Sequence, residues 1–85
     1  MMQPGAGDLV QSRAGHDRGQ YFVVVSVREE SGAVWIADGK GRRVADPKRK
    51  NPRHLHMVRR AVLTGAQLTD SCVRRTIGAY VQSIQ

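Results

Sequence analysis

The segment Gln20–Val27 restricts the fold of this chain more than any other feature. It is rich in β-branched and aromatic residues, which favour extended strands. Alternation along a strand places Tyr21, Val23, Val25 and Val27 on one face, and Phe22, Val24 and Ser26 on the other. Because both faces are largely apolar, we expect one of them to fill the interior of a small β-structure and a helix to cover part of the other.

Turn signals recur about every ten residues around this segment, which is the spacing of a small all-β barrel or sandwich. We expect strands at residues 8–13, 20–27, 33–37, 42–45 and 53–58. Gly15 and Gly19 bound the first turn, where positive φ is needed at both ends. Residues 46–52 contain two prolines and four charges, which excludes a central strand and predicts an extended loop.

After Gly65 the apolar period changes from two to about 3.6, which predicts an amphipathic C-terminal helix. The stripe consists of Leu68, Cys72, Val73, Ile77, Tyr80, Val81 and Ile84. Thr69 or Asp70 caps its start. Gly78 lies inside the helix at a cost of about 1 kcal/mol relative to alanine, so the helix depends on packing against the β-structure.

The chain of 85 residues has room for one domain, too small for two lobes with a substrate cleft between them. Cys72 is its only cysteine, so no intramolecular disulfide is possible, which is compatible with a reducing compartment. Residues 1–11 contain no Lys or Arg and no apolar run, unlike a signal peptide. No apolar run approaches the length of a membrane span, so we expect a cytoplasmic protein with no membrane partner.

Positive charge is concentrated in one part of the chain. The net charge of the whole chain is +7, whereas residues 40–60 alone contain nine basic residues and one acidic residue. The other residues are nearly neutral in sum. A field concentrated in this way predicts a polyanionic partner.

The strongest candidate for binding is the run 48–54, Lys-Arg-Lys-Asn-Pro-Arg-His. Opposing acids are almost absent and arginine outnumbers lysine, and arginine forms paired hydrogen bonds to phosphate oxygens. Pro47 and Pro52 stiffen the segment and lower the entropy that it loses on binding. The alternative is a solvated loop that only aids solubility.

The turn Gly15–Gly19 is a second candidate, because it can present backbone amides with His16 and Arg18 to a phosphate. The alternative is that its two glycines serve only the geometry of the turn, since the spacing matches neither a P-loop nor a dinucleotide fingerprint. Asp17 is expected to orient the turn or to pair with Arg18 rather than to perform acid–base chemistry.

The remaining candidate residues are weaker. Trp35 and Tyr21 can stack on unpaired bases, but aromatic residues form only 5% of the chain, and we expect Trp35 in the core or at its rim. His54 and His56 share a strand face but have no third metal ligand nearby, and Cys72 is expected to be a buried hydrophobe. No metal or other cofactor is therefore expected.

Ser12, His16 and Asp17 provide the residue types of a hydrolytic triad. Their closeness in sequence gives no reason to expect triad geometry, so a small hydrolase rests on these residue types alone. We expect neither an enzyme nor a small-molecule substrate. A protein-interaction module, such as a transcription-elongation adaptor, is the main alternative function, because the second strand has an apolar outer face and the helix is amphipathic.

The stretch 8–25, with Gly19 in the place of the signature glycine, resembles a KOW motif. The continuations 37–40 and 47–55 are similar to short bacterial KOW-domain RNA-binding proteins, which are related to an archaeal and eukaryotic large-subunit ribosomal protein. The resemblance covers roughly residues 8–57. The C-terminal helix departs from the family because it carries fewer charges.

The resemblance implies a mainly β fold, a five-stranded SH3-like (KOW) barrel, which we place at residues 8–58. The composition of residues 1–7 predicts a disordered tail, and the apolar period places the helix in an extension at 59–85. It implies binding of structured RNA, ribosomal RNA above all, with ribosomal proteins as further partners and a role on the ribosome or in its assembly. The RNA-binding residues that it implies are Arg13, His16, Asp17, Arg18, Lys40, Arg42, Arg43, Lys48, Arg49, Lys50, Asn51, Arg53 and His54. We expect the turn and the basic loops to converge on one end of the barrel.

Overall fold

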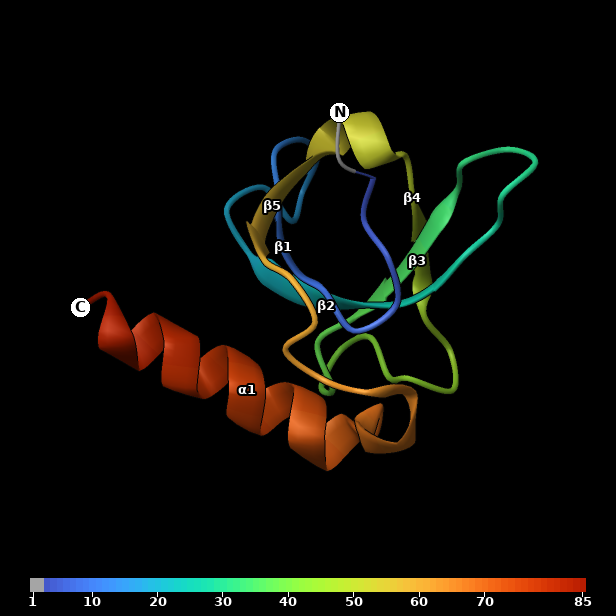
Figure 1. Cartoon of the computed structure of the whole chain (residues 1–85). Helices are drawn as coiled ribbons and strands as arrows, with labels where there is room; N and C mark the ends of the chain where they lie inside the picture. The colour runs from blue at the N-terminus through green and yellow to red at the C-terminus, as the bar shows by residue number, and fades with distance from the viewer. Residues whose placement is uncertain (1–2) are drawn as a thin grey trace.

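Five antiparallel strands form one open sheet in the computed structural model, which describes residues 3–85. The strands are β1 (Leu9–Ser12), β2 (Tyr21–Val27), β3 (Val34–Ala37), β4 (Lys48–Lys50) and β5 (Leu55–Arg59). Their order is β4-β3-β2-β1-β5, and the sheet is strongly curved (Figure 1). Two short 3₁₀ helices, η1 (Pro52–His54) and η2 (Gly65–Gln67), precede the helix α1 (Asp70–Ser83). The prediction of a mainly β fold with a C-terminal helix is therefore confirmed.

The concave face of the sheet holds one apolar core cluster. Its buried members are Val10, Phe22, Val24, Val34, Ile36 and Leu55, which come from β1, β2, β3 and β5. Phe22 and Val24 both point into this cluster, as alternation along β2 requires. The curvature of the sheet thus lets strands that are not neighbours share one interior.

The opposite face of β1 and β2 packs against α1 and the segment before it. Leu9, Val23, Leu63 and Val73 form this second cluster, with Ile77 and other half-buried residues around them. Figure 1 shows α1 lying across the lower side of the sheet, with its C-terminal end projecting beyond it. The two apolar faces of β2 are explained, since one faces the interior and the other faces the helix.

A β-bulge near the end of β2 reverses the expected alternation. The register shifts between Val24 and Ser26, so that Val27 lies opposite Val34 and packs against the inner cluster. The prediction that Val27 shares the face of Val23 was wrong, because the extra residue of a bulge moves all later side chains to the other face.

The fourth strand lies later in the chain than expected. Residues 42–45 form bends and turns, in which the Asp38 carboxylate accepts hydrogen bonds from the Lys40 and Arg42 amides. The strand is Lys48–Lys50, inside the segment that we expected to be a loop. It lies between Pro47 and Pro52 and at the sheet edge, where neither proline interrupts a ladder hydrogen bond.

The helix start follows its predicted capping chemistry. Thr69 is extended, and its hydroxyl accepts a hydrogen bond from the Cys72 amide at 3.2 Å. Asp70 follows in the first turn and accepts from the Val44 amide, which ties the 42–45 segment to the helix. In the part of the chain that the structure describes, no helix has the length and apolarity needed to cross a bilayer.

The N-terminal segment is held against the sheet from Gly7 onward. Gly7 is buried, donates to the Val24 carbonyl at 2.8 Å and accepts from the Val62 and Leu63 amides. Its φ of +92° favours glycine. The expected disordered tail included this residue, and Met1 and Met2 of that tail lie outside the described residues.

Candidate functional site

Alternation along β4 separates its three basic side chains. Lys48 and Lys50 lie opposite Ile36 and Val34, whose side chains fill the interior of the sheet. Arg49 lies opposite Trp35 on the outer face. The basic run is therefore not one surface, because two of its lysines face inward and its arginine faces outward.

The two inward lysines bind a single carboxylate. Asp17 accepts from the Nζ atoms of Lys48 and Lys50, each at 2.8 Å, and from the Ser12 hydroxyl at 2.6 Å. The Lys50 ammonium also donates to the Ala14 carbonyl oxygen, and Lys50 is only 9% exposed. The expectation that Asp17 pairs with Arg18 was wrong, and Lys50 is committed to this internal cluster rather than to solvent.

These contacts perturb the acidity of Asp17. Burial alone would raise the pKa of its carboxyl, but the hydrogen bonds from Lys48, Lys50 and Ser12 outweigh burial. Together with the charge of Lys50, they hold the pKa of Asp17 well below its ordinary value of 3.8. Asp17 is therefore an ionised structural acceptor that joins the first turn to the edge strand β4.

The depressed pKa of Asp17 predicts a loss of stability in acid. Because its pKa is lower in the folded than in the unfolded chain, its contribution is complete above the ordinary value of 3.8 and falls as the pH drops below it. Replacing Asp17 by Asn should lessen the slope of unfolding free energy against pH there, by at most about 1.4 kcal/mol per pH unit. Urea unfolding between pH 2 and 5 (about the titration range of carboxylates) measures this. Asp46→Asn, at an exposed site, is the control, and equal slopes in wild type and Asp17→Asn would contradict the prediction.

Exposed basic residues lie in the chain near the Asp17 cluster, at the first turn, β4 and η1. The exposed predicted site residues here are Arg13, His16, Arg18, Arg49, Arg53 and His54. Two adjoining grooves, of about 630 and 350 Å³, meet at Pro52 and Arg53. The larger is lined by Arg49 and Arg53, the smaller by Arg13 and Arg53, and neither is lined by an acidic residue. We call these two together the η1 grooves.

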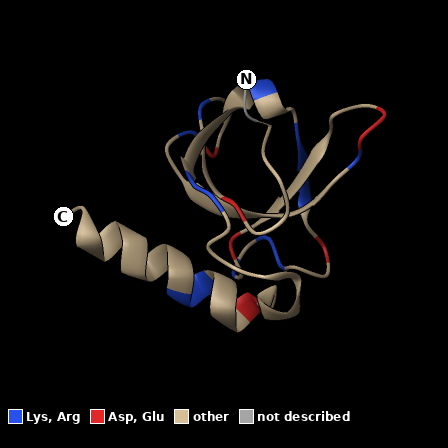
Figure 2. Ribbon diagram, in the orientation of Figure 1, with Lys and Arg blue, Asp and Glu red and all other residues tan. Residues whose placement is uncertain are grey.

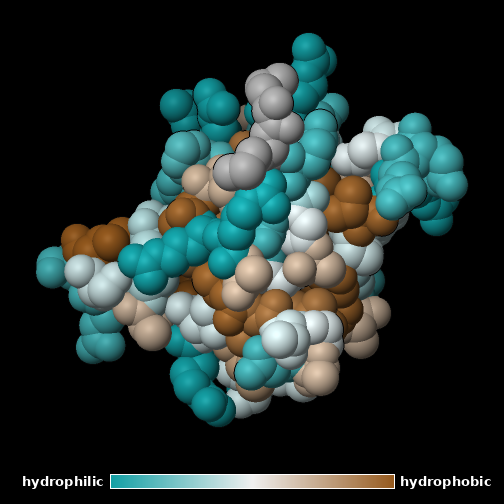
Figure 3. Space-filling view, in the orientation of Figure 1, coloured by the Kyte–Doolittle hydropathy of each residue, from teal (hydrophilic) through white to brown (hydrophobic). Residues whose placement is uncertain are grey.

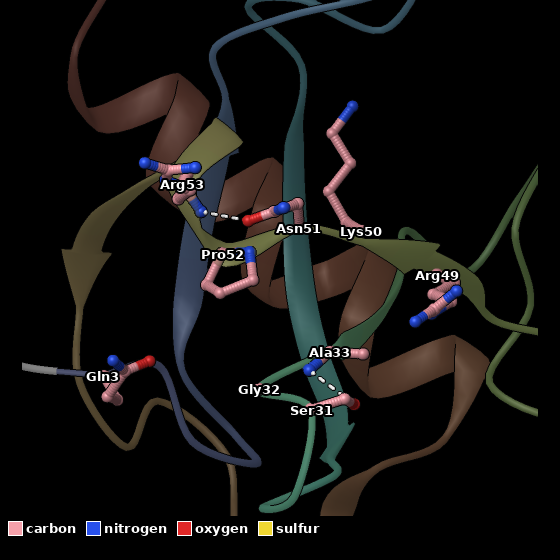
Figure 4. Close-up of a pocket in the computed structure, with 9 residues that line it drawn as sticks. All are labelled: Gln3, Ser31, Gly32, Ala33, Arg49, Lys50, Asn51, Pro52 and Arg53. Carbon is pink, nitrogen blue, oxygen red and sulfur yellow. Dashed lines mark hydrogen bonds between the residues drawn. The ribbon is translucent and has the colours of Figure 1, made fainter.

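Figure 4 shows how the larger of the η1 grooves is built. Arg53 and Pro52 come from η1, Arg49 from β4, and Ser31 and Gly32 from the β2–β3 connection. The Lys50 side chain runs away from the other lining residues, toward its partner Asp17. The Asn51 side chain accepts from the Arg53 amide at 2.9 Å and so caps η1, which fixes the backbone that carries Arg53.

The other predicted basic residues lie elsewhere. Lys40, Arg42 and Arg43 are exposed in the loop that is bound to the start of α1, where Arg74 donates to the Gly39 carbonyl oxygen at 2.8 Å. Figure 2 shows Lys and Arg near α1, at the bottom of the view, as well as at η1, at its top. Ion pairs of Asp17 join the first turn to β4, whereas Lys40, Arg42 and Arg43 lie in the loop that is bound to α1.

The weaker chemical candidates are not brought together. Ser12 is buried and donates directly to Asp17, with no histidine between them, while His16 is exposed. This is not the arrangement of a nucleophile, base and orienting acid. Within residues 3–85, no three His, Cys, Asp or Glu side chains are grouped so that they could hold a metal ion.

Two residues in or near the η1 grooves were not predicted from the sequence. Arg28 and Ser31 were treated only as a hairpin connection, yet Ser31 lines the larger of the η1 grooves and Arg28 lies over Trp35. The sequence offered one indication: Arg28 directly follows an apolar strand, and a long side chain at that position can lie against the sheet. Figure 3 shows hydrophilic side chains gathered over this hairpin and over the upper end of the molecule.

Comparison with known proteins found no relative of this chain. No protein-family model matches the chain, and no curated protein matches it.

Proposed function

We propose that this protein is an RNA-binding module whose sheet is a KOW-type SH3-like barrel, and that the η1 grooves hold the phosphate backbone of structured RNA. The observation that carries the proposal is the set of three exposed arginines, Arg13, Arg49 and Arg53, in grooves without a lining acid. Guanidinium groups bind phosphate oxygens through paired hydrogen bonds, and such contacts provide most of the affinity of proteins for nucleic acids.

Ribosomal RNA is the ligand that the resemblance to KOW proteins favours. Structured RNA is recognised largely by its shape and its phosphates, which suits a small surface rich in arginine. The proposal also includes association with the ribosome or its assembly, in the cytoplasm.

The barrel is supported by contacts between parts of the sheet that are distant in its strand order. Lys48 and Lys50 of the edge strand β4 reach Asp17 beyond the end of β1. Toward the other edge, the Arg13 amide donates to the carbonyl oxygen of His54, the last residue of η1, at 2.7 Å. The end of β1 and the first turn thus contact both β4 and the last residue of η1, which brings the two edge strands toward each other.

The apolar outer face of β2 and the amphipathic helix, which suggested a protein-interaction module, pack against each other. The outer face of β2, with Tyr21 and Val23, packs against Ile77, Tyr80 and the rest of the helix cluster. The Tyr21 and Tyr80 rings lie 5.3 Å apart in an edge-to-face arrangement. RNA binding is therefore the function that the remaining exposed surface supports best.

Reversing the charge of the η1 grooves should weaken RNA binding selectively. In Arg49→Glu/Arg53→Glu, two phosphate contacts are replaced by repulsion, so we expect at least tenfold weaker binding and a log affinity–log salt slope about 2 units shallower. Titration of the protein into a labelled ribosomal RNA fragment at several salt concentrations measures both. For about four phosphate contacts, the wild-type slope should be roughly −3 to −4.

The matched control is Arg42→Glu/Arg43→Glu, which changes the charge equally in the loop beside α1. We expect this variant to keep most of the affinity. If both double variants lose affinity equally, binding depends on net charge and not on the η1 grooves. A wild-type slope near zero, or no binding of RNA, would overturn the proposed function.

A further inference from the structure

Trp35 lies on a part of the sheet that the helix does not cover. It is only partly buried and belongs to neither of the two apolar core clusters. Its neighbours across the sheet are Ser26 on β2 and Arg49 on β4. The helix packs on the part of the same face that contains Leu9 and Val23, so the face around Trp35 is left to solvent.

Two arginines flank this tryptophan. The guanidinium carbon of the exposed Arg28 lies 5.6 Å from the ring centroid, a cation–π distance. Arg49 is the direct cross-strand neighbour of Trp35, and their side chains stand on the same face. Arg49 also lines the larger of the η1 grooves, so it lies between that groove and the tryptophan.

A shallow depression of about 530 Å³ lies beside the ring, and acidic residues are part of its lining. Trp35, Arg28 and Pro47 line it together with Glu29 and Glu30 at the hairpin tip. The two glutamates repel phosphate, whereas Arg49 on the other side attracts it. A nucleotide stacked on Trp35 would therefore place its phosphate toward Arg49 and away from the two glutamates.

We propose that Trp35, flanked by Arg28 and Arg49, is a stacking site for an unpaired RNA base next to the η1 grooves. Unpaired bases stack on aromatic rings and on guanidinium planes, so a base stacks either on the Arg28 guanidinium that lies over the ring or on the ring once Arg28 moves aside. A base inside a duplex cannot reach such a site. The inference rests on the proposed function, and it specifies RNA with a single-stranded loop, bulge or end as the substrate class.

Trp35 is the only tryptophan of the chain, so its fluorescence reports directly on this site. The probes are a single-stranded adenine-rich RNA of about ten nucleotides and the same strand annealed to its complement. We expect the single strand to quench the fluorescence of the wild-type protein and the duplex to leave it nearly unchanged. Trp35→Leu should bind the single strand about tenfold more weakly and the duplex equally well, whereas Trp35→Phe, which keeps a ring, should retain most of the affinity.

The outcomes separate this inference from the proposed function. If RNA binds with the expected salt dependence but quenches no fluorescence, and Trp35→Leu binds the single strand as well as wild type does, the stacking site is overturned and the proposed function stands. If neither RNA binds the wild-type protein, both are overturned. The quenching of wild type decides the matter even if Trp35→Leu folds poorly.

Discussion

Asp17→Ala is expected to destabilise the protein by about 3 to 5 kcal/mol, which is typical when one partner of a buried ion pair is removed. The substitution leaves the Lys50 ammonium, 9% exposed, with the Ala14 carbonyl as its remaining acceptor. It also removes the acceptor of Lys48 and leaves the buried Ser12 hydroxyl with the Ala14 carbonyl oxygen alone. Urea unfolding at neutral pH, followed by circular dichroism, measures the loss.

A double variant shows whether the charge of Lys50 causes that loss. In Asp17→Ala/Lys50→Met no uncompensated ammonium remains in the interior, so we expect most of the stability to return. The exposed Asp46→Ala controls for loss of a carboxylate and should change stability by less than about 0.5 kcal/mol. A loss below about 1 kcal/mol for Asp17→Ala would mean that the carboxylate does not hold Lys50 in the folded protein.

Gly7→Ala is expected to cost about 3 kcal/mol or more, because two penalties combine. The residue has φ +92°, which side chains with a Cβ rarely adopt, and a Cβ there would overlap the backbone carbonyl of Leu63. The neighbouring hydrogen bonds to Val24, Val62 and Leu63 prevent the backbone from moving away. Denaturant unfolding midpoints compared with wild type measure the effect.

Gly19→Ala is the matched control for Gly7→Ala. Its φ of +89° is nearly the same, but nothing lies within 4 Å of the added Cβ. We therefore expect a loss of about 1 to 2 kcal/mol from the backbone conformation alone. The difference between the two variants measures the crowding at Leu63. Equal losses would show that Gly7 does not pack against that carbonyl as described.

The buried Asp17 cluster changes how the basic run should be interpreted. Counting charges treats Lys48, Arg49 and Lys50 as equivalent, whereas the fold assigns the lysines to Asp17 and the arginine to the surface. A charge reversal at Lys50 would therefore test folding rather than RNA binding. Only Arg49 and the exposed residues around η1 give a clean test of the interface.

Local patterns in the sequence predicted most of the secondary structure. The β-branched run of β2, the two glycines of the first turn with φ of +84° and +89°, and the Thr69 cap of α1 all appear as expected. Each depends on neighbouring residues only. The position of β4 was missed because pairing with β3 decides it, and three basic residues have no intrinsic preference for a strand.

The candidate site was predictable in composition but not in arrangement. The residues around the first turn and η1 were identified from their charge, and several of them are exposed together there. Charge along the chain did not reveal that Lys40, Arg42 and Arg43 lie by the start of α1. Contacts far apart in sequence decide that separation, because the β3–β4 connection is hydrogen-bonded to α1 through Asp70 and Arg74.

A mainly β chain, a capped C-terminal helix and a strong local excess of positive charge can all be read from the sequence. Those features follow from side-chain alternation, backbone preference and composition, which act over a few residues. Only the tertiary structure decided which cations face solvent, because burial and ion pairing depend on residues far apart in the chain. Asp17 lies more than thirty positions from Lys50, and their contact at 2.8 Å holds this lysine in the interior, while Arg49 next to it in the chain is exposed.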